Sequence, residues 1–188
     1  PTKYVGPFYT EERTREIMKE RDWNIKKDSN RGWRRVVPSP NPLSIIEKNL
    51  VELLLHEGRV VVAAGGGGIP VYREEDGWLE GVDGVIDKDL SSAVLGSDIG
   101  ADDLLIMTGV EKVAIIFGEP NEQQLDRLTV SEAKQYYDEG HFPAGSMGPK
   151  IRAAIRFLEG GGKRVVITSI DHSAAAVRGE AGTLIVND

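Results

Sequence analysis

The sequence contains no cysteine, which excludes disulfide bonds and thiolate metal sites. A reducing cytoplasm is compatible with this absence, and we expect the protein to be cytoplasmic. The chain also lacks any apolar run that approaches the roughly 20 residues of a membrane-spanning helix. Nothing near Pro1 has the features of a signal peptide. We therefore expect no membrane partner.

The sequence contains few histidines, and its positively charged residues do not outnumber its negatively charged ones. The three histidines, His56, His141 and His172, are far apart in the sequence and lack the spacing of metal ligands. The formal net charge is −7, whereas a surface that binds nucleic acid needs a basic face. We therefore expect neither a metal held by the protein's own side chains nor a nucleic-acid partner.

Short apolar strands alternate with amphipathic helices along most of the chain. We expect helices at about 10–21, 44–58, 90–95, 129–140 and 150–159, and strands at 60–64, 104–107, 113–116, 164–168 and 183–186. Ser44 with Glu47 and Thr129 with Glu132 have the spacing of capping boxes. This alternation predicts an α/β fold with a largely parallel sheet sandwiched by helices. Ligands of such sheets bind at the carboxyl ends of the strands.

The first 37 residues differ from this pattern. Segments 23–27 and 33–37 flank the turn-rich residues 28–32, which indicates a small hairpin after the first helix. Three prolines within 38–42 then make a rigid, extended connection. We therefore expect a small α+β subdomain at 1–37 and a nucleotide-binding α/β domain at 38–188.

Two lysines stand where helices are expected to begin. Lys88 follows the turn-rich segment 81–87, and Lys150 follows Pro149. The N-terminal end of a helix carries unpaired N–H groups and partial positive charge, so it attracts anions. We expect Lys88 and Lys150 to converge on one polyphosphate, with Asp89 orienting them, as in a phosphoryl-transfer site. The alternative is a charge cluster exposed to solvent.

A run of four glycines, Gly65, Gly66, Gly67 and Gly68, follows the expected strand at 60–64. Glycines let backbone N–H groups approach an anion closely, because no Cβ intervenes. The run is not a P-loop, since no Gly-Lys-Ser/Thr follows, and Pro70 rules out a dinucleotide fingerprint. We expect an anion-binding loop for the substrate. A tight turn at the edge of the domain remains the alternative.

Several longer stretches resemble one known family. They include GGGGIPV at 65–71, VIDKD at 85–89 and HFPAGSMGPK at 141–150. Further matching stretches are 1–3, 6–8, 31–40, 108–110 and 117–121. Together and in this order they resemble the carbamate kinases of the amino-acid-kinase fold family. The Gly-Gly-Asn and Gly-Asn-Gly-Pro loops of that family do not occur here, so the resemblance implies that its N-terminal, carbamate-side portion is missing from this chain.

The resemblance implies a role for each matching residue. Lys88 and Lys150 would contact the transferring and leaving phosphates, Asp89 would hold both lysines, and Lys3 would reach from a protruding subdomain toward the substrate. The residues that would surround the nucleotide are Thr108, Gly109, Val110, Phe117, Gly118, Gly145, Ser146 and Met147. The implied ligands are ATP or ADP with Mg²⁺, which we expect to be held mainly through the phosphates.

The reaction implied by the resemblance is reversible phosphoryl transfer between ATP and carbamate, which gives ADP and carbamoyl phosphate. Positioning and charge neutralisation carry most of such a reaction, and this agrees with a sequence that shows no obvious nucleophile or histidine base. The complete enzyme would be a homodimer. Two alternatives stay open: an inactive nucleotide-binding fragment, and another kinase of the same fold that acts on an amino acid or UMP.

Overall fold

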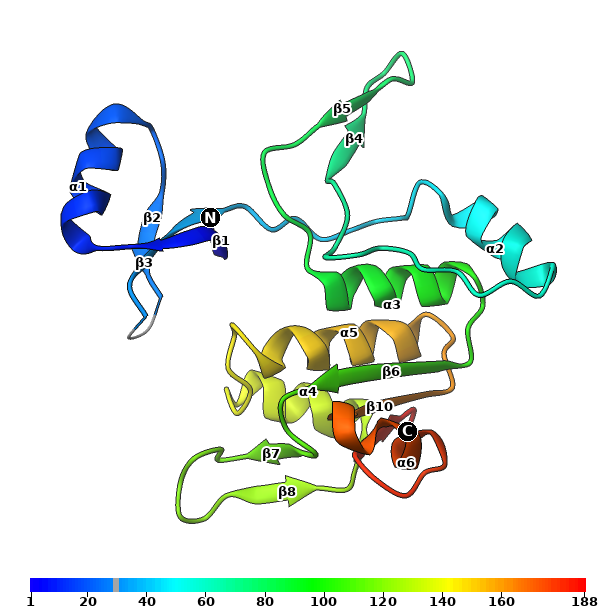
Figure 1. The fold of residues 1–188 in the computed structure, drawn as a ribbon. Helices are drawn as coiled ribbons and strands as arrows, with labels where there is room; N and C mark the ends of the chain where they lie inside the picture. Colours follow the sequence, from blue (N-terminus) through cyan, green and yellow to red (C-terminus); the bar gives the residue numbers. More distant parts are fainter. Residues whose placement is uncertain (29–30) are drawn as a thin grey trace. The chain divides into compact units, whose positions relative to one another are not determined.

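The computed structural model describes residues 1–28 and 31–188 (Figure 1). The chain divides into two compact units. The first contains Pro1–Asn41 and Gly68–Asp87, and the second contains Pro42–Gly67 and Lys88–Asp188. Residues 68–87 thus group with the N-terminal residues, although the expected boundary at residue 38 placed them in the second domain. The functional division at that boundary stays a prediction.

The first unit contains a three-stranded antiparallel sheet, a helix and a separate hairpin. The sheet has the strand order β1-β3-β2. Its elements are β1 (Lys3–Tyr9), α1 (Glu11–Glu20), β2 (Ile25–Lys27) and β3 (Trp33–Val37), and the separate hairpin consists of β4 (Val71–Arg73) and β5 (Leu79–Gly81). Thr10 caps α1 by accepting a hydrogen bond from the Arg13 amide, as the sequence predicted. The predicted β2–β3 hairpin is confirmed, while Ser29 and Asn30 of its turn lie outside the described residues.

The second unit is built on a four-stranded sheet with the order β6-β10-β11-β9. Its strands and hairpin are β6 (Asp103–Thr108), β7 (Val113–Ile115), β8 (Gln123–Leu125), β9 (Arg127–Thr129), β10 (Arg164–Ser169) and β11 (Thr183–Val186). Its helices are α2 (Lys48–His56), α3 (Lys88–Asp98), α4 (Val130–Asp138), α5 (Met147–Glu159), the 3₁₀ helix η1 (Ile170–His172) and α6 (Ser173–Val177). The pairs β6–β10 and β11–β9 are parallel, and β10–β11 is antiparallel.

The predicted α/β class is confirmed, with a sheet that is mixed rather than wholly parallel. The capping box of Thr129 and Glu132 at the start of α4 is also confirmed. Arg164 donates two hydrogen bonds to Asp103 where β10 and β6 begin, and these bonds lower the pKa of the Asp103 carboxyl. Within residues 1–28 and 31–188, no helix combines the length and apolar character that crossing a bilayer requires.

The predictions for residues 44–64 were wrong in two respects. Helix α2 begins at Lys48, and Ser44 Oγ donates to Asp98 Oδ2 instead of capping the helix. No strand forms at 60–64, where Val60 and Val62 are 98% and 97% exposed. A strand needs a partner for its backbone N–H and C=O groups, and the apolar sequence cannot supply one by itself.

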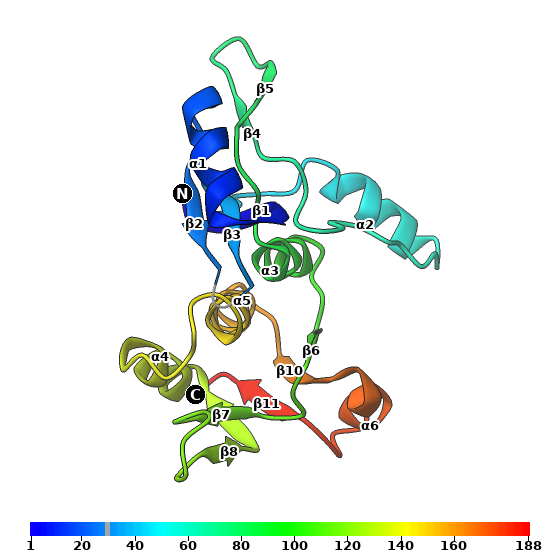
Figure 2. The same cartoon turned by 60° about the vertical axis from the view of Figure 1, so that its left-hand side comes forward.

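Helices α3 and α5 lie side by side in both views, and Figure 1 shows that they run in the same direction (Figures 1 and 2). Asp89 meets Lys150 near their first turns, while the ring of Phe157 reaches Gly96 further along. Phe157 is fully buried and belongs to the core formed by α3, α5 and the sheet. The close approach of the two helices therefore depends on a large ring that faces residues without a side chain.

We expect Gly162→Ala to disturb this packing. A methyl group at Gly162 would come within 2.2 Å of Phe157 Cε1, and the ring is fully buried. Overpacking of this kind costs about 1–3 kcal/mol. Urea unfolding followed by circular dichroism measures the loss.

Gly81→Ala is the control, because a methyl group there would meet nothing within 4 Å. Adding Phe157→Leu to the Gly162→Ala variant should recover part of the stability lost through the clash. Equal stabilities of Gly162→Ala and the unmodified chain would contradict this account.

Candidate functional site

The first turns of α3 and α5 lie together at one end of the second unit. Both helices run in the same direction, and their first turns meet through Asp89 and Lys150. Strand β6 also ends on this side of the unit (Figure 1). Each helix N-terminus contributes partial positive charge, so two of them side by side favour a bound anion. The fold therefore supplies a positive potential here before any charged side chain is counted.

Asp89 joins the two predicted lysines at this end. Lys150 Nζ donates to Asp89 Oδ2 at 2.8 Å, and Lys88 Nζ lies 3.3 Å from the same carboxylate. Asp89 and Lys150 are both buried, whereas the side chain of Lys88 is more than half exposed. The structure thus brings together Lys88, Asp89 and Lys150, the three residues that the sequence predicted to meet.

The charges in this cluster do not cancel. One carboxylate is shared by two ammonium groups, which leaves one positive charge in excess at the meeting point of two helix N-termini. Burying Lys150 would be unfavourable without Asp89, because a buried charge needs a partner to offset its desolvation. The arrangement suits a multiply charged anion, since Lys88 is accessible and Lys150 is held in a fixed position.

The glycine run lies next to the same helix. Ser91, on the first turn of α3, is fully buried and donates from Oγ to the carbonyl of Gly67 at 2.7 Å. Gly65 and Gly67 have φ values of +47° and +134°, and Gly68 has +82°, conformations that residues with a side chain rarely adopt. Ser91 therefore ties the loop at Gly67 to the helix turn that carries Lys88 and Asp89.

The expected nucleotide residues follow β6 and β7 and precede α5. Thr108 ends β6, opposite Ser169 at the end of the neighbouring parallel strand β10, and Gly109 and Val110 come next. Ser169 Oγ in turn lies 2.8 Å from His172 Nδ1. These positions are at the carboxyl ends of parallel strands, where α/β proteins bind ligands.

Two loops complete the expected nucleotide set. Phe117 is exposed after β7, and the amide of Gly118 donates to Glu122 Oε2 at 2.9 Å. Residues Gly145, Ser146 and Met147 lead into α5, and the Pro143 carbonyl accepts from the Ser146 and Gly148 amides there. Contact of these loops with a nucleotide stays a prediction.

Lys3 belongs to the first unit. Its Nζ lies 2.5 Å from Asp87 Oδ2, and the Asp87 side chain is buried. Asp87 directly precedes Lys88 in the chain. The predicted role of Lys3 at the substrate stays a prediction, and its structural partner is an acidic residue of the same VIDKD stretch.

Sequence reasoning assigned no role to Asp87 or Ser91. Asp87 could have been found from its position, because it directly precedes Lys88 and Asp89, which the sequence analysis assigned to the site. Ser91 gave no such signal, because a serine in the first turn of a helix is common and its partner Gly67 is 24 residues away. Only the folded chain shows that Ser91 fastens the glycine run.

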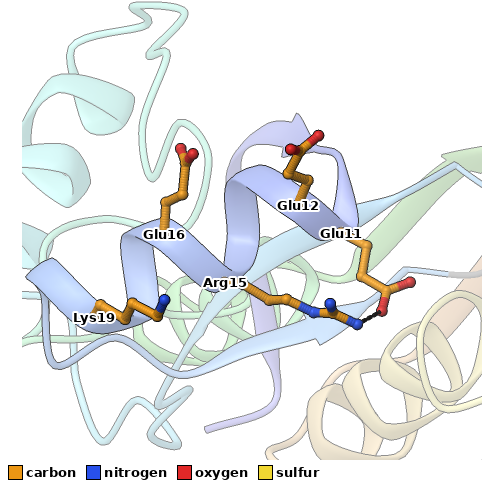
Figure 3. Close-up of a pocket in the computed structure, with 5 residues that line it drawn as sticks. All are labelled: Glu11, Glu12, Arg15, Glu16 and Lys19. Carbon is orange, nitrogen blue, oxygen red and sulfur yellow. Dashed lines mark hydrogen bonds and ion pairs between the residues drawn. The ribbon is translucent and has the colours of Figure 1, made fainter.

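A surface hollow lies elsewhere, on one face of α1. It is lined by Glu11, Glu12, Arg15, Glu16 and Lys19, and Arg15 pairs with Glu11 across it (Figure 3). All five side chains come from a single exposed helix, which does not build a binding site. Among the residues that the structure describes, no group of three or more histidine, aspartate or glutamate side chains could hold a metal ion.

Comparison with known proteins places these features in a family. Residues 11–169 match the amino acid kinase family. Carbamate kinase from Thermococcus kodakarensis is 50% identical over 188 residues, which are 100% of this chain and 59% of that protein. The carbamate kinase-like protein YahI from Escherichia coli is 51% identical over 99% of this chain and 59% of its own length.

The structural comparison agrees. Carbamate kinase from Giardia lamblia bound to AMP-PNP superposes with a TM-score of 0.87 and 42% identity, over 100% of this chain and 60% of that one. The chain thus spans about three fifths of the length of the relatives it matches. The family match covers most of the chain, and the chain therefore belongs to the amino acid kinase family.

Proposed function

We propose that this chain carries the nucleotide half and the phosphate-binding lysines of a carbamate kinase. The observation that carries the proposal is the Asp89 carboxylate shared by Lys88 and Lys150 where α3 and α5 begin. The names of the relatives support the reaction, which is reversible transfer of a phosphoryl group between ATP and carbamate. The binding of AMP-PNP by the Giardia relative supports ATP or ADP as the nucleotide.

In this proposal each residue acts by position and charge. Lys88 and Lys150 neutralise the transferring and leaving phosphates, and Asp89 keeps the two ammonium groups oriented toward them. The loop at 65–68 faces the anionic substrate, and Lys3 reaches the substrate end. Thr108, Gly109, Val110, Phe117, Gly118 and the residues 145–147 surround the nucleotide.

Mg²⁺ would neutralise part of the phosphate charge when it is bound with the nucleotide. Asp89 is engaged by two lysines, and the described residues form no acidic cluster for the ion. The ion would therefore be held mainly by phosphate oxygens, in line with the preference of Mg²⁺ for few protein ligands. The family resemblance supports two further proposals, that the complete enzyme is a homodimer and that it acts in the cytoplasm.

A second candidate is a nucleotide-binding fragment without turnover. The observation that favours it is that the chain spans only 59% of the Thermococcus relative. A coupled assay for ATP formation from ADP and carbamoyl phosphate, beside calorimetry with ADP, separates the two candidates. Nucleotide binding without ATP formation supports the fragment, and turnover by the 188-residue chain supports the enzyme.

Binding of AMP-PNP tests the lysines in this chain directly. We expect Lys88→Ala and Lys150→Ala each to weaken the affinity roughly tenfold to a hundredfold, since a hydrogen bond to a charged group contributes about 1.5–3 kcal/mol. Isothermal titration calorimetry measures the affinities. Lys134→Ala is the matched control, because Lys134 lies on α4 and pairs with Glu159 at the surface. Equal affinities for all three variants would refute the proposed contacts.

Turnover tests the same lysines in a chain of full carbamate kinase length that contains these residues. We expect Lys88→Ala or Lys150→Ala to lower kcat by two or more orders of magnitude, because each tenfold corresponds to about 1.4 kcal/mol of transition-state stabilisation. The coupled ATP assay measures this loss. Near-normal turnover of both variants would show that the assigned roles are wrong.

A further inference from the structure

The turn between β6 and β7 is fixed at both of its ends. Thr108, the last residue of β6, lies opposite Ser169 in the parallel register with β10. At the other end, the Val113 amide donates to the buried Thr183 Oγ1 at 2.8 Å. Residues 109–112 lie between these two points and form no helix or strand. The position of this turn therefore also depends on the contacts that its side chains make.

His172 links this turn to the end of β10. Ser169 Oγ lies 2.8 Å from His172 Nδ1, and His172 Nε2 lies 3.6 Å from Glu111 Oε2. The first distance is that of a hydrogen bond, whereas the second exceeds the range of one. The contact between His172 and Glu111 therefore acts through charge, and it attracts only while the imidazole is protonated. We name Ser169, His172 and Glu111 the His172 bridge.

The bridge adjoins the expected nucleotide residues. Glu111 directly follows Val110, and Ser169 lies beside Thr108 across the sheet. The side chains of Glu111 and His172 are 45% and 44% exposed, so water screens their attraction. An ion pair of this kind changes an equilibrium by no more than about fivefold. The bridge can therefore adjust ligand binding, and it is too weak to decide whether the chain folds.

The other charged groups near His172 have partners of their own. The charged residues on the neighbouring elements are Asp171 in η1, Lys112 in the turn, Arg164 at the far end of β10, and Arg178 and Glu180 after α6. The cations among them pair with carboxylates, Lys112 with Asp126, Arg164 with Asp103 and Arg178 with Glu180. Helix α6 itself carries no charged residue. Asp171 is unchanged in every variant used below, so differences between variants report on Glu111.

We propose that the His172 bridge positions the turn at 109–112 and makes nucleotide binding dependent on pH. The inference rests on the proposed function, because only that proposal brings the turn to the nucleotide. Protonated His172 donates from Nδ1 to Ser169 Oγ and attracts Glu111, which draws the turn toward the end of β10. After loss of the proton, Ser169 Oγ can still donate to Nδ1, but the attraction of Glu111 is lost. His172 is thus a positioning residue that acts through Glu111.

Calorimetry with AMP-PNP from about pH 5.5 to 8.5 tests this inference, since histidine changes its charge within this range. At the acidic end, we expect the unmodified chain to bind roughly twofold to fivefold more tightly than His172→Gln. At the basic end the two affinities should be equal. The phosphates of AMP-PNP also titrate, so the readout is the difference between the two pH profiles.

His172→Lys is the conservative variant, because lysine stays charged over the whole range. It should bind AMP-PNP more tightly than His172→Gln at every pH. Adding Glu111→Gln to both variants should remove this difference, which separates pairing with Glu111 from direct attraction of the phosphates. His56→Gln is the matched control, because His56 is an exposed histidine on α2. Its pH profile should match that of the unmodified chain.

Nuclear magnetic resonance of the free chain gives a readout without nucleotide. The shift of the Gly109 amide should follow the titration of the His172 imidazole, with a smaller change in Glu111→Gln. A Gly109 shift that does not follow His172 would overturn the inference, as would equal pH profiles for the unmodified chain and His172→Gln. If Gly109 followed His172 but the chain bound no AMP-PNP at any pH, the proposed function would be contradicted and the bridge would stand.

Discussion

The Asp89 carboxylate is the constraint on which the candidate site depends. Two lysine ammonium groups close to two helix N-termini would repel one another and oppose both helix dipoles. A buried carboxylate between them offsets this repulsion and fixes the position of Lys150. Because it offsets only one of the two charges, the site keeps a net attraction for an anion. The same carboxylate thus stabilises the cluster and supports the anion binding that we propose for it.

The cluster exists only because α3 and α5 run side by side in the same direction. That packing is close because Phe157 meets Gly96 and Gly162, where a side chain would collide with its ring. Ser91 then fastens the carbonyl of Gly67 to the first turn of α3. Core packing therefore determines where the lysines and the glycine run lie, as expected for a densely packed interior.

Within the VIDKD stretch at 85–89, Asp87 belongs to the first unit and Lys88 to the second. Asp87 is buried in the first unit, where it pairs with Lys3, and Lys88 begins α3 in the second. Asp87 thus forms an ion pair with Lys3, whereas the next residues, Lys88 and Asp89, belong to the cluster with Lys150. In the second unit, Leu50 and Leu53 of α2 remain more than half exposed, in contrast to the buried core around α5.

The sequence by itself determined the local features. Thr10 and Thr129 cap their helices, and Lys88 and Lys150 stand in first turns, because such signals depend on residues three or four positions apart. Only the tertiary structure decided which distant groups meet. Asp89 and Lys150 are 61 residues apart, and the Ser91–Gly67 bond spans 24. The strand expected at 60–64 failed for the same reason, since apolar residues favour a strand but only a partner's backbone can complete one.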